Sequence, residues 1–216
     1  MNDISLGRIF GFPLALQPSA LLILAIFVLM GARDGAASMG NGVLLALVVF
    51  GSILVHELGH AFVARAFKLG PIDITLHGFG GFTRFGRVPG PKQGILVTLA
   101  GPGASFLLGG AALLAVMFVD AGRIDHLLGT AASINLFWGV FNLLPMYPLD
   151  GGLVTWHGLS LFTAKDTAQK WAARIGVLVA VGVGTVAGLA GEIFIAIIAV
   201  MSLMRSVPLA LEPARR

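Results

Sequence analysis

Three residues that together could hold a metal and use it for hydrolysis stand close to one another: His56, Glu57 and His60. On a helix, residues four apart share one face, so both imidazoles could bind the same metal ion. Glu57 follows the first histidine and could take a proton from a water molecule beside that metal. Two histidines and a glutamate at this spacing form a specific motif. The alternative is a polar cluster that only holds helices together, which is a costly use of three ionisable side chains in an apolar stretch.

A catalytic zinc ion usually takes three protein ligands and a water molecule, so a third ligand must come from elsewhere in the chain. Asp150 is the best candidate, in the segment NLLPMYPLDGG of residues 142–152. Its prolines break a helix and its glycines allow a sharp turn of the backbone. Broken backbone at membrane depth is tolerated only where it is buried in protein or lines a cavity. A divalent ion with ionised Asp150 and Glu57 carries no net charge, which lowers the cost of burying them.

The composition indicates the environment in which these residues work. Of 216 residues, 57% are hydrophobic and 11% are charged, whereas roughly a quarter are charged in soluble domains. This excludes a disordered chain and makes a soluble globule a poor interpretation. Cysteine is absent, so thiolate metal sites and disulfides are excluded. Nucleic acid is not an expected partner, because the Lys and Arg residues form no dense stripe.

Long uncharged runs predict about six membrane-spanning helices in a single domain that covers residues 1–216. The expected spans are residues 13–32, 42–66, 94–119, 127–144, 171–188 and 191–207. The last two could instead form one long helix. If they form a hairpin, twelve Lys and Arg residues lie on the cytoplasmic side of the membrane and two on the outer side. If they form one helix, the numbers become nine on the cytoplasmic side and five on the outer side. Because positive residues favour the cytoplasmic side, we expect the hairpin, with both termini and the mouth of the metal site in the cytoplasm.

A short β-hairpin is expected on the cytoplasmic side between the second and third spans. Apolar and polar residues alternate over residues 72–77, and three glycines follow at positions 78, 80 and 81. The edge of such a hairpin could pair with an unwound substrate peptide by strand addition. Proline at Ile74 is expected to remove a backbone donor there, and so to impair cleavage without changing metal content.

The two motifs together resemble the site-2 protease family of intramembrane zinc metalloproteases. The resemblance rests on an HExxH motif in a predicted membrane helix, followed about ninety residues later by N-x-x-P-x-x-P-L-D-G-G. It covers nearly the whole chain, including AGPGAS at residues 100–105, and is best with the compact six-span form that has no PDZ-like or nucleotide-sensing module. It implies that one zinc ion per chain is bound by His56, His60 and Asp150. It also implies that Glu57 is the general base and that Asn142 steadies the substrate or the oxyanion.

The sequence therefore favours an all-helical, polytopic membrane bundle with a small sheet, working as an intramembrane zinc metallo-endopeptidase. Its expected partners are the lipid bilayer and single-span membrane proteins, cut in or near their transmembrane segments. A divalent-metal transporter is the main alternative, but its polar residues should step across several helices, whereas here they cluster at one depth. An inactive relative that only binds membrane helices is a third interpretation, which the intact motifs argue against. His77 and His157 are weaker candidates for roles near the site.

Overall fold

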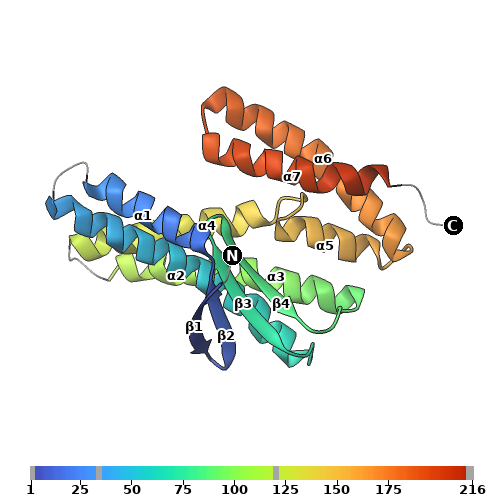
Figure 1. The fold of residues 1–216 in the computed structure, drawn as a ribbon, viewed down its shortest axis with the longest axis horizontal. Coiled ribbons are helices and arrows are strands. Elements are labelled where there is room, and N and C mark those ends of the chain that lie inside the picture. Colours follow the sequence, from blue (N-terminus) through green and yellow to red (C-terminus); the bar gives the residue numbers. More distant parts are fainter. Residues whose placement is uncertain (1–2, 33–35, 119–121, 213–216) are drawn as a thin grey trace. The chain divides into compact units, whose positions relative to one another are not determined.

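The computed structural model describes residues 3–32, 36–118 and 122–212. The described residues form seven helices and four strands, which Figure 1 labels. In chain order these are β1 (Ile4–Ile9), β2 (Phe12–Leu16), α1 (Pro18–Ala32), α2 (Ala36–Ala66), β3 (Ile72–His77), β4 (Gly80–Phe85), α3 (Pro91–Val116), α4 (Arg123–Asn142), α5 (Asp150–Leu159), α6 (Lys165–Ala190) and α7 (Ile193–Leu211). The chain divides into two compact units, which are described separately. The first comprises Met1–Val88 and Ala100–Gly139, and the second Pro89–Leu99 and Val140–Arg216.

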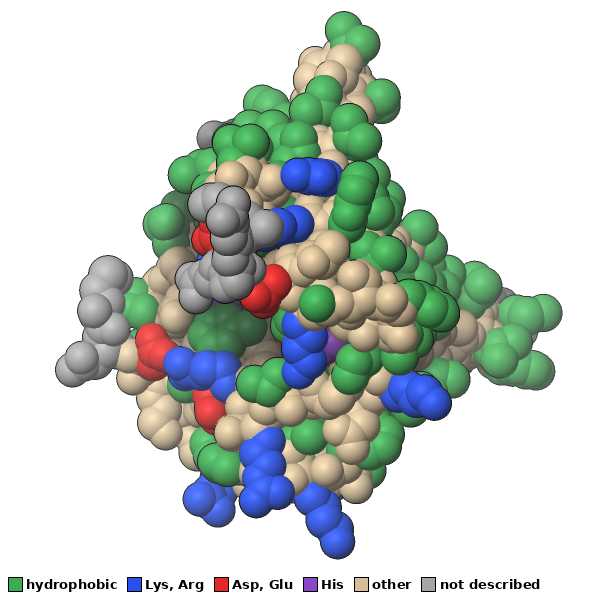
Figure 2. Space-filling view, turned by 90° about the vertical axis from the view of Figure 1, so that its right-hand side faces the viewer, with side chains coloured by type: hydrophobic (Ala, Val, Ile, Leu, Met, Phe, Trp, Pro, Cys, Tyr) green, Lys and Arg blue, Asp and Glu red, His purple; other side chains and the backbone are tan. Residues whose placement is uncertain are grey.

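Among the described residues, four helical stretches are long and apolar enough to cross a membrane: Gly40–Ala66, Pro91–Val116, Lys165–Ala190 and Ile193–Leu211. A shorter apolar stretch lies in α1, at Pro18–Leu29. Large apolar side chains are exposed on every one of these helices. The face drawn in Figure 2 shows hydrophobic side chains open at the surface, among polar and basic ones. Exposed apolar area on this scale suits lipid and not water.

These features confirm the expected class, a polytopic helical membrane protein with a small sheet. The count of six spans and the cytoplasmic position of the termini stay predictions. Arg33, Arg215 and Arg216, which entered the charge count, lie outside the described residues.

The first unit contains a four-stranded sheet with the order β1-β2-β3-β4. The expected hairpin of β3 and β4 is confirmed, with Ile74 opposite Thr83 and a two-residue turn after His77. The strands β1 and β2 were not predicted, and residues 13–16 are a strand instead of the start of the first span. The reason is pairing at long range: β2 runs parallel to β3, with Leu14 opposite Ile74. An apolar run of this length reads equally well as strand or helix until its partner is known.

The β1–β2 hairpin is fastened to the last turn of α2. Its two-residue turn, Phe10 and Gly11, has positive φ angles of 49° and 87°. Such a turn matches the twist of a hairpin, although phenylalanine is an unusual residue in it. Arg65 of α2 donates a hydrogen bond to the carbonyl of Phe10 at 2.9 Å, and its guanidinium lies over the ring of Phe12. The end of the metal-motif helix and the sheet therefore form one packed structure.

The second unit contains the paired helices α6 and α7 (Figure 1). Gly191 separates them in the left-handed conformation, with φ of 75°, and caps α6. The expected division of this region into two helices is confirmed, whereas the short helix α5 was not predicted. The loop before α5 packs on the pair through Met146, which is fully buried beside Ala180 and Ile198. The backbone around Asp150 is thereby anchored to the two terminal helices.

Candidate metal centre

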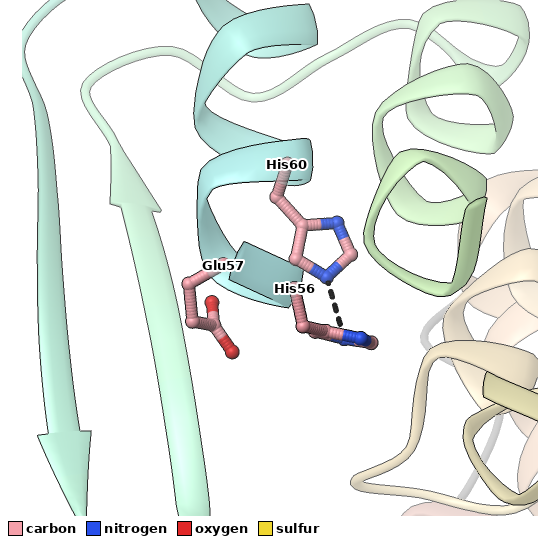
Figure 3. Close-up of side chains that lie close together, drawn as sticks. All are labelled: His56, Glu57 and His60. Atoms are coloured by element: carbon pink, nitrogen blue, oxygen red, sulfur yellow. Dashed lines mark hydrogen bonds between the residues drawn. The ribbon is translucent and has the colours of Figure 1, made fainter. Parts of the chain in front are cut away.

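The residues of the HExxH motif lie in the apolar helix α2 and are buried. His56, Glu57 and His60 are each less than 10% exposed, and candidate ligand atoms of all three lie within 4.8 Å of one another. The two imidazoles point toward each other, with their Nε2 atoms 3.2 Å apart (Figure 3). Two nitrogens bound to a tetrahedral zinc ion at 2.0–2.1 Å would lie about 3.3 Å apart. The spacing of the imidazoles therefore fits a shared zinc ion that both bind through Nε2.

Helix α3 forms a wall of small residues against this motif. A Cβ atom added at Gly59 of α2 would strike the carbonyl oxygen of Ala100 and lie 2.9 Å from the Cβ atom of Ala104. One added at Gly101 would lie 2.7 Å from Nε2 of His56 and would also strike Nε2 of His60. Glycine at position 101 therefore leaves room for the two imidazoles. Small residues of this kind let membrane helices approach closely.

Two hydroxyl groups hold the motif from either side, and the sequence singled out neither of them for such a role. Ser105 of α3 lies 3.0 Å from Nδ1 of His56 through its Oγ atom. Thr83 of β4 donates a hydrogen bond to Oε2 of Glu57 at 2.7 Å and lies 3.1 Å from the main-chain oxygen of Glu57. A Cβ atom added at Gly81 of β4 would lie 2.6 Å from Cγ of Glu57. The Glu57 side chain is therefore packed directly against β4 and lies beside the imidazoles, on the side nearer the sheet (Figure 3).

One turn before the motif, α2 is joined to α4 by a buried hydrogen bond. Asn135 donates through Nδ2 to the hydroxyl of Ser52 at 2.7 Å. A side-chain bond of this kind fixes how two apolar helices are rotated against each other.

The other two predicted site residues, Asn142 and Asp150, lie in the second unit. Asn142 is buried at the end of α4, and Asp150 is the first residue of α5. A Cβ atom added at Gly151 would strike the carbonyl oxygens of residues 143 and 144, and one at Gly152 would lie 2.8 Å from the backbone of Met146. These glycines therefore allow the loop before α5 to approach the helix closely. The sharp turn expected at these two positions is absent, because both glycines lie within α5. The roles of Asn142 and Asp150 stay predictions.

The remaining histidines considered above have local partners. His77 accepts a hydrogen bond at Nδ1 from the amide of Phe79, and burial lowers its pKa. His157 is buried in α5, stacks on Trp156 and lies against Gly94, where no Cβ atom would fit. Burial lowers the pKa of His157, and the nearby charge of Lys165 lowers it further. Both imidazoles therefore favour the neutral form, and we assign neither a role in chemistry.

The model of peptidase family M50 matches residues 44–121 and 117–183, which include the HExxH motif and Asp150. The chain belongs to this family.

Several known proteins resemble the chain over most of its length. The zinc metalloprotease MJ0392 of Methanocaldococcus jannaschii is 33% identical over 179 residues, which are 81% of this chain and 50% of that protein. Rip3 of Mycobacterium tuberculosis is 33% identical over 221 residues, covering 92% of this chain and 56% of its own. The chain thus spans about half the length of these two curated relatives. The solved structure of the site-2 protease from Methanocaldococcus jannaschii is similar with a TM-score of 0.72 and 26% identity, covering 100% of this chain and 98% of the other.

Proposed function

We propose that the protein is an intramembrane zinc metallo-endopeptidase that cuts membrane proteins in or near their transmembrane segments. The observation that carries this proposal is the buried pair of Nε2 atoms 3.2 Å apart in an apolar helix, with Glu57 beside them. Membership of peptidase family M50 supports the same reaction class. A transporter site or a purely structural cluster has no need of a carboxylate next to a metal ligand.

The proposed metal ligands are His56, His60 and Asp150, with one zinc ion per chain. Asp150 is proposed because catalytic zinc sites usually have three protein ligands and because the glycines after it hold the chain tightly at the start of α5. When bound, zinc would polarise the scissile carbonyl and acidify the attacking water. Chemical analysis of zinc should therefore find about one ion per chain in the parent protein and much less in His56→Ala, His60→Ala and Asp150→Ala.

Glu57 is the proposed general base. Its carboxylate takes a proton from the attacking water and passes it to the leaving amine. The hydrogen bond from Thr83 holds this carboxylate in one orientation. Asn142 is proposed to donate a hydrogen bond to the substrate or to the oxyanion that develops on it.

A membrane helix hides its carbonyl groups in internal hydrogen bonds, so a substrate must unwind before it is cut. Its bare backbone groups then need partners, since each unsatisfied group in an apolar site costs several kcal/mol. We propose that an unwound substrate pairs with the outer edge of β4. This strand is the last in the sheet order and packs directly on Glu57.

Strand pairing by the substrate should be tested at a different residue from Ile74. Ile74 lies in β3, fully buried between β2 and β4, so proline there would break the sheet instead of an edge. The amide of Gly86 bonds to the carbonyl of Pro71, which places even-numbered amides of β4 toward β3. The amide of Phe85 therefore faces outward. Phe85→Pro should lower kcat/KM for a single-span substrate and keep the zinc content, whereas Phe85→Ala, which retains the amide, should lower it less.

The central test uses the purified chain with a panel of single-span membrane proteins, with and without a zinc chelator. The parent protein should cut at least one of them and stop when zinc is removed. Glu57→Gln should retain about one zinc ion per chain and lose cleavage, because the base is not a ligand. Full cleavage by Glu57→Gln would refute the mechanism. Metal uptake into vesicles that persists in Glu57→Gln, without any cleavage by the parent, would favour the transporter instead.

A further inference from the structure

The two imidazoles of the motif can share a metal only in one protonation pattern. Their Nε2 atoms face each other at 3.2 Å, so these are the atoms that would bind the ion. For both to bind, neither Nε2 can carry a proton. The remaining proton of the neutral His56 ring must then lie on Nδ1, which has to donate it to an acceptor. In a buried, apolar surrounding, a donor without an acceptor is costly.

Ser105 provides that acceptor. Its Oγ atom lies 3.0 Å from Nδ1 of His56, within the range of a hydrogen bond, and the side chain is about 1% exposed. It comes from α3, forty-nine residues away in the chain, so its position depends on how α2 and α3 pack. One turn earlier on α3, Gly101 leaves space for both imidazoles. One face of α3 therefore supplies room through Gly101 and a hydrogen-bond acceptor through Ser105.

We propose that Ser105 is a positioning residue that fixes the tautomer and ring orientation of His56 for metal binding. The inference rests on the proposed function, since it assumes that His56 is a metal ligand. Partners of this kind raise the affinity of a metal site because the free ring would otherwise divide between two tautomers and several orientations. Ser105 itself touches neither the reacting atoms nor the metal.

The test measures metal binding by the full chain and needs no substrate. Zn²⁺ affinity is determined by competition with a chromophoric chelator, and the ligand geometry is followed through the absorption bands of bound Co²⁺. Ser105→Ala should weaken Zn²⁺ binding by about 10–100-fold and alter the Co²⁺ bands. Ser52→Ala is the matched control: it also removes a buried serine hydroxyl, one turn from His56, but one that is bonded to Asn135. Ser52→Ala should lower the unfolding temperature and leave Zn²⁺ affinity unchanged.

A second pair of variants separates the hydroxyl from packing. Ser105→Thr and Ser105→Val have the same shape, and only the first retains a hydroxyl. The threonine variant should bind Zn²⁺ at least tenfold more tightly than the valine variant. Equal affinities in this pair, or equal losses in Ser105→Ala and Ser52→Ala, would overturn the proposal. His56→Ala tests the metal centre separately. If this variant binds Zn²⁺ as tightly as the parent, the proposed function fails. If His56→Ala loses Zn²⁺ affinity and the Ser105 variants do not, only the proposed role of Ser105 fails.

Discussion

Adding one methyl group at Gly101 should disable the metal centre while leaving the fold intact. The new Cβ atom would lie 2.7 Å from Nε2 of His56 and would also strike Nε2 of His60. Comfortable contact needs about 3.5 Å, so both imidazoles must move, that of His56 by about 0.8 Å. Zinc sites tolerate deviations of only about 0.2 Å in ligand distance. Loss of a hydrogen bond that supports a metal ligand typically weakens metal binding by about 10–100-fold. Displacement of the ligands themselves should have a larger effect, so we expect Gly101→Ala to weaken Zn²⁺ binding by about 100-fold or more.

The cost to the fold should be smaller than the loss of metal. Overpacking typically costs about 1–3 kcal/mol, and alanine offsets about 1 kcal/mol of this because it favours the helix over glycine. Gly103→Ala is the matched control, since a Cβ atom there would meet nothing within 4 Å. It should bind Zn²⁺ as the parent does and unfold at the same or a slightly higher temperature. Competition titration with Zn²⁺ and thermal unfolding in detergent measure both effects. Undiminished Zn²⁺ affinity in Gly101→Ala would refute the view that the imidazoles are held rigidly against α3.

Two further predictions follow from side chains around the site and in the second unit. Thr83→Val retains the shape of the side chain but loses the hydrogen bond to Glu57. A hydrogen bond to a charged group contributes about 1.5–3 kcal/mol, so kcat should fall about 10–100-fold while the zinc content stays unchanged. An unchanged kcat would contradict the positioning role of Thr83. Burial lowers the pKa of His157, so the unfolded chain binds a proton more readily than the folded chain. The contribution of His157 to the free energy of unfolding is therefore complete above about pH 6.5 and is lost as the pH falls toward the folded-state pKa. The unfolding temperature, measured at about pH 7 and pH 5.5, should fall less on acidification in His157→Gln than in the parent. His126→Gln, which changes an exposed histidine, should behave like the parent. An equal fall in unfolding temperature in all three proteins would reject this account.

Much of the protein could be predicted because the deciding interactions are local. The HExxH motif needs only a helix to bring its two histidines onto one face, and an apolar surrounding predicts that helix well. The hairpin of β3 and β4 follows from strict alternation and a two-residue turn. Each of these features involves residues within about a dozen positions of one another.

Tertiary structure alone decided what surrounds the motif. Strand β2 was mistaken for helix because its partner, β3, lies about sixty residues further along, and an apolar run carries no sign of a distant partner. Ser105 and Thr83 are ordinary residues in the sequence, and they become neighbours of His56 and Glu57 only when α3 and β4 pack against α2. The requirement for glycine at position 101 arises in the same way, from the space that two imidazoles of another helix occupy. Local periodicity selects the elements, whereas the groups that orient a catalytic residue depend on contacts between elements far apart in the chain.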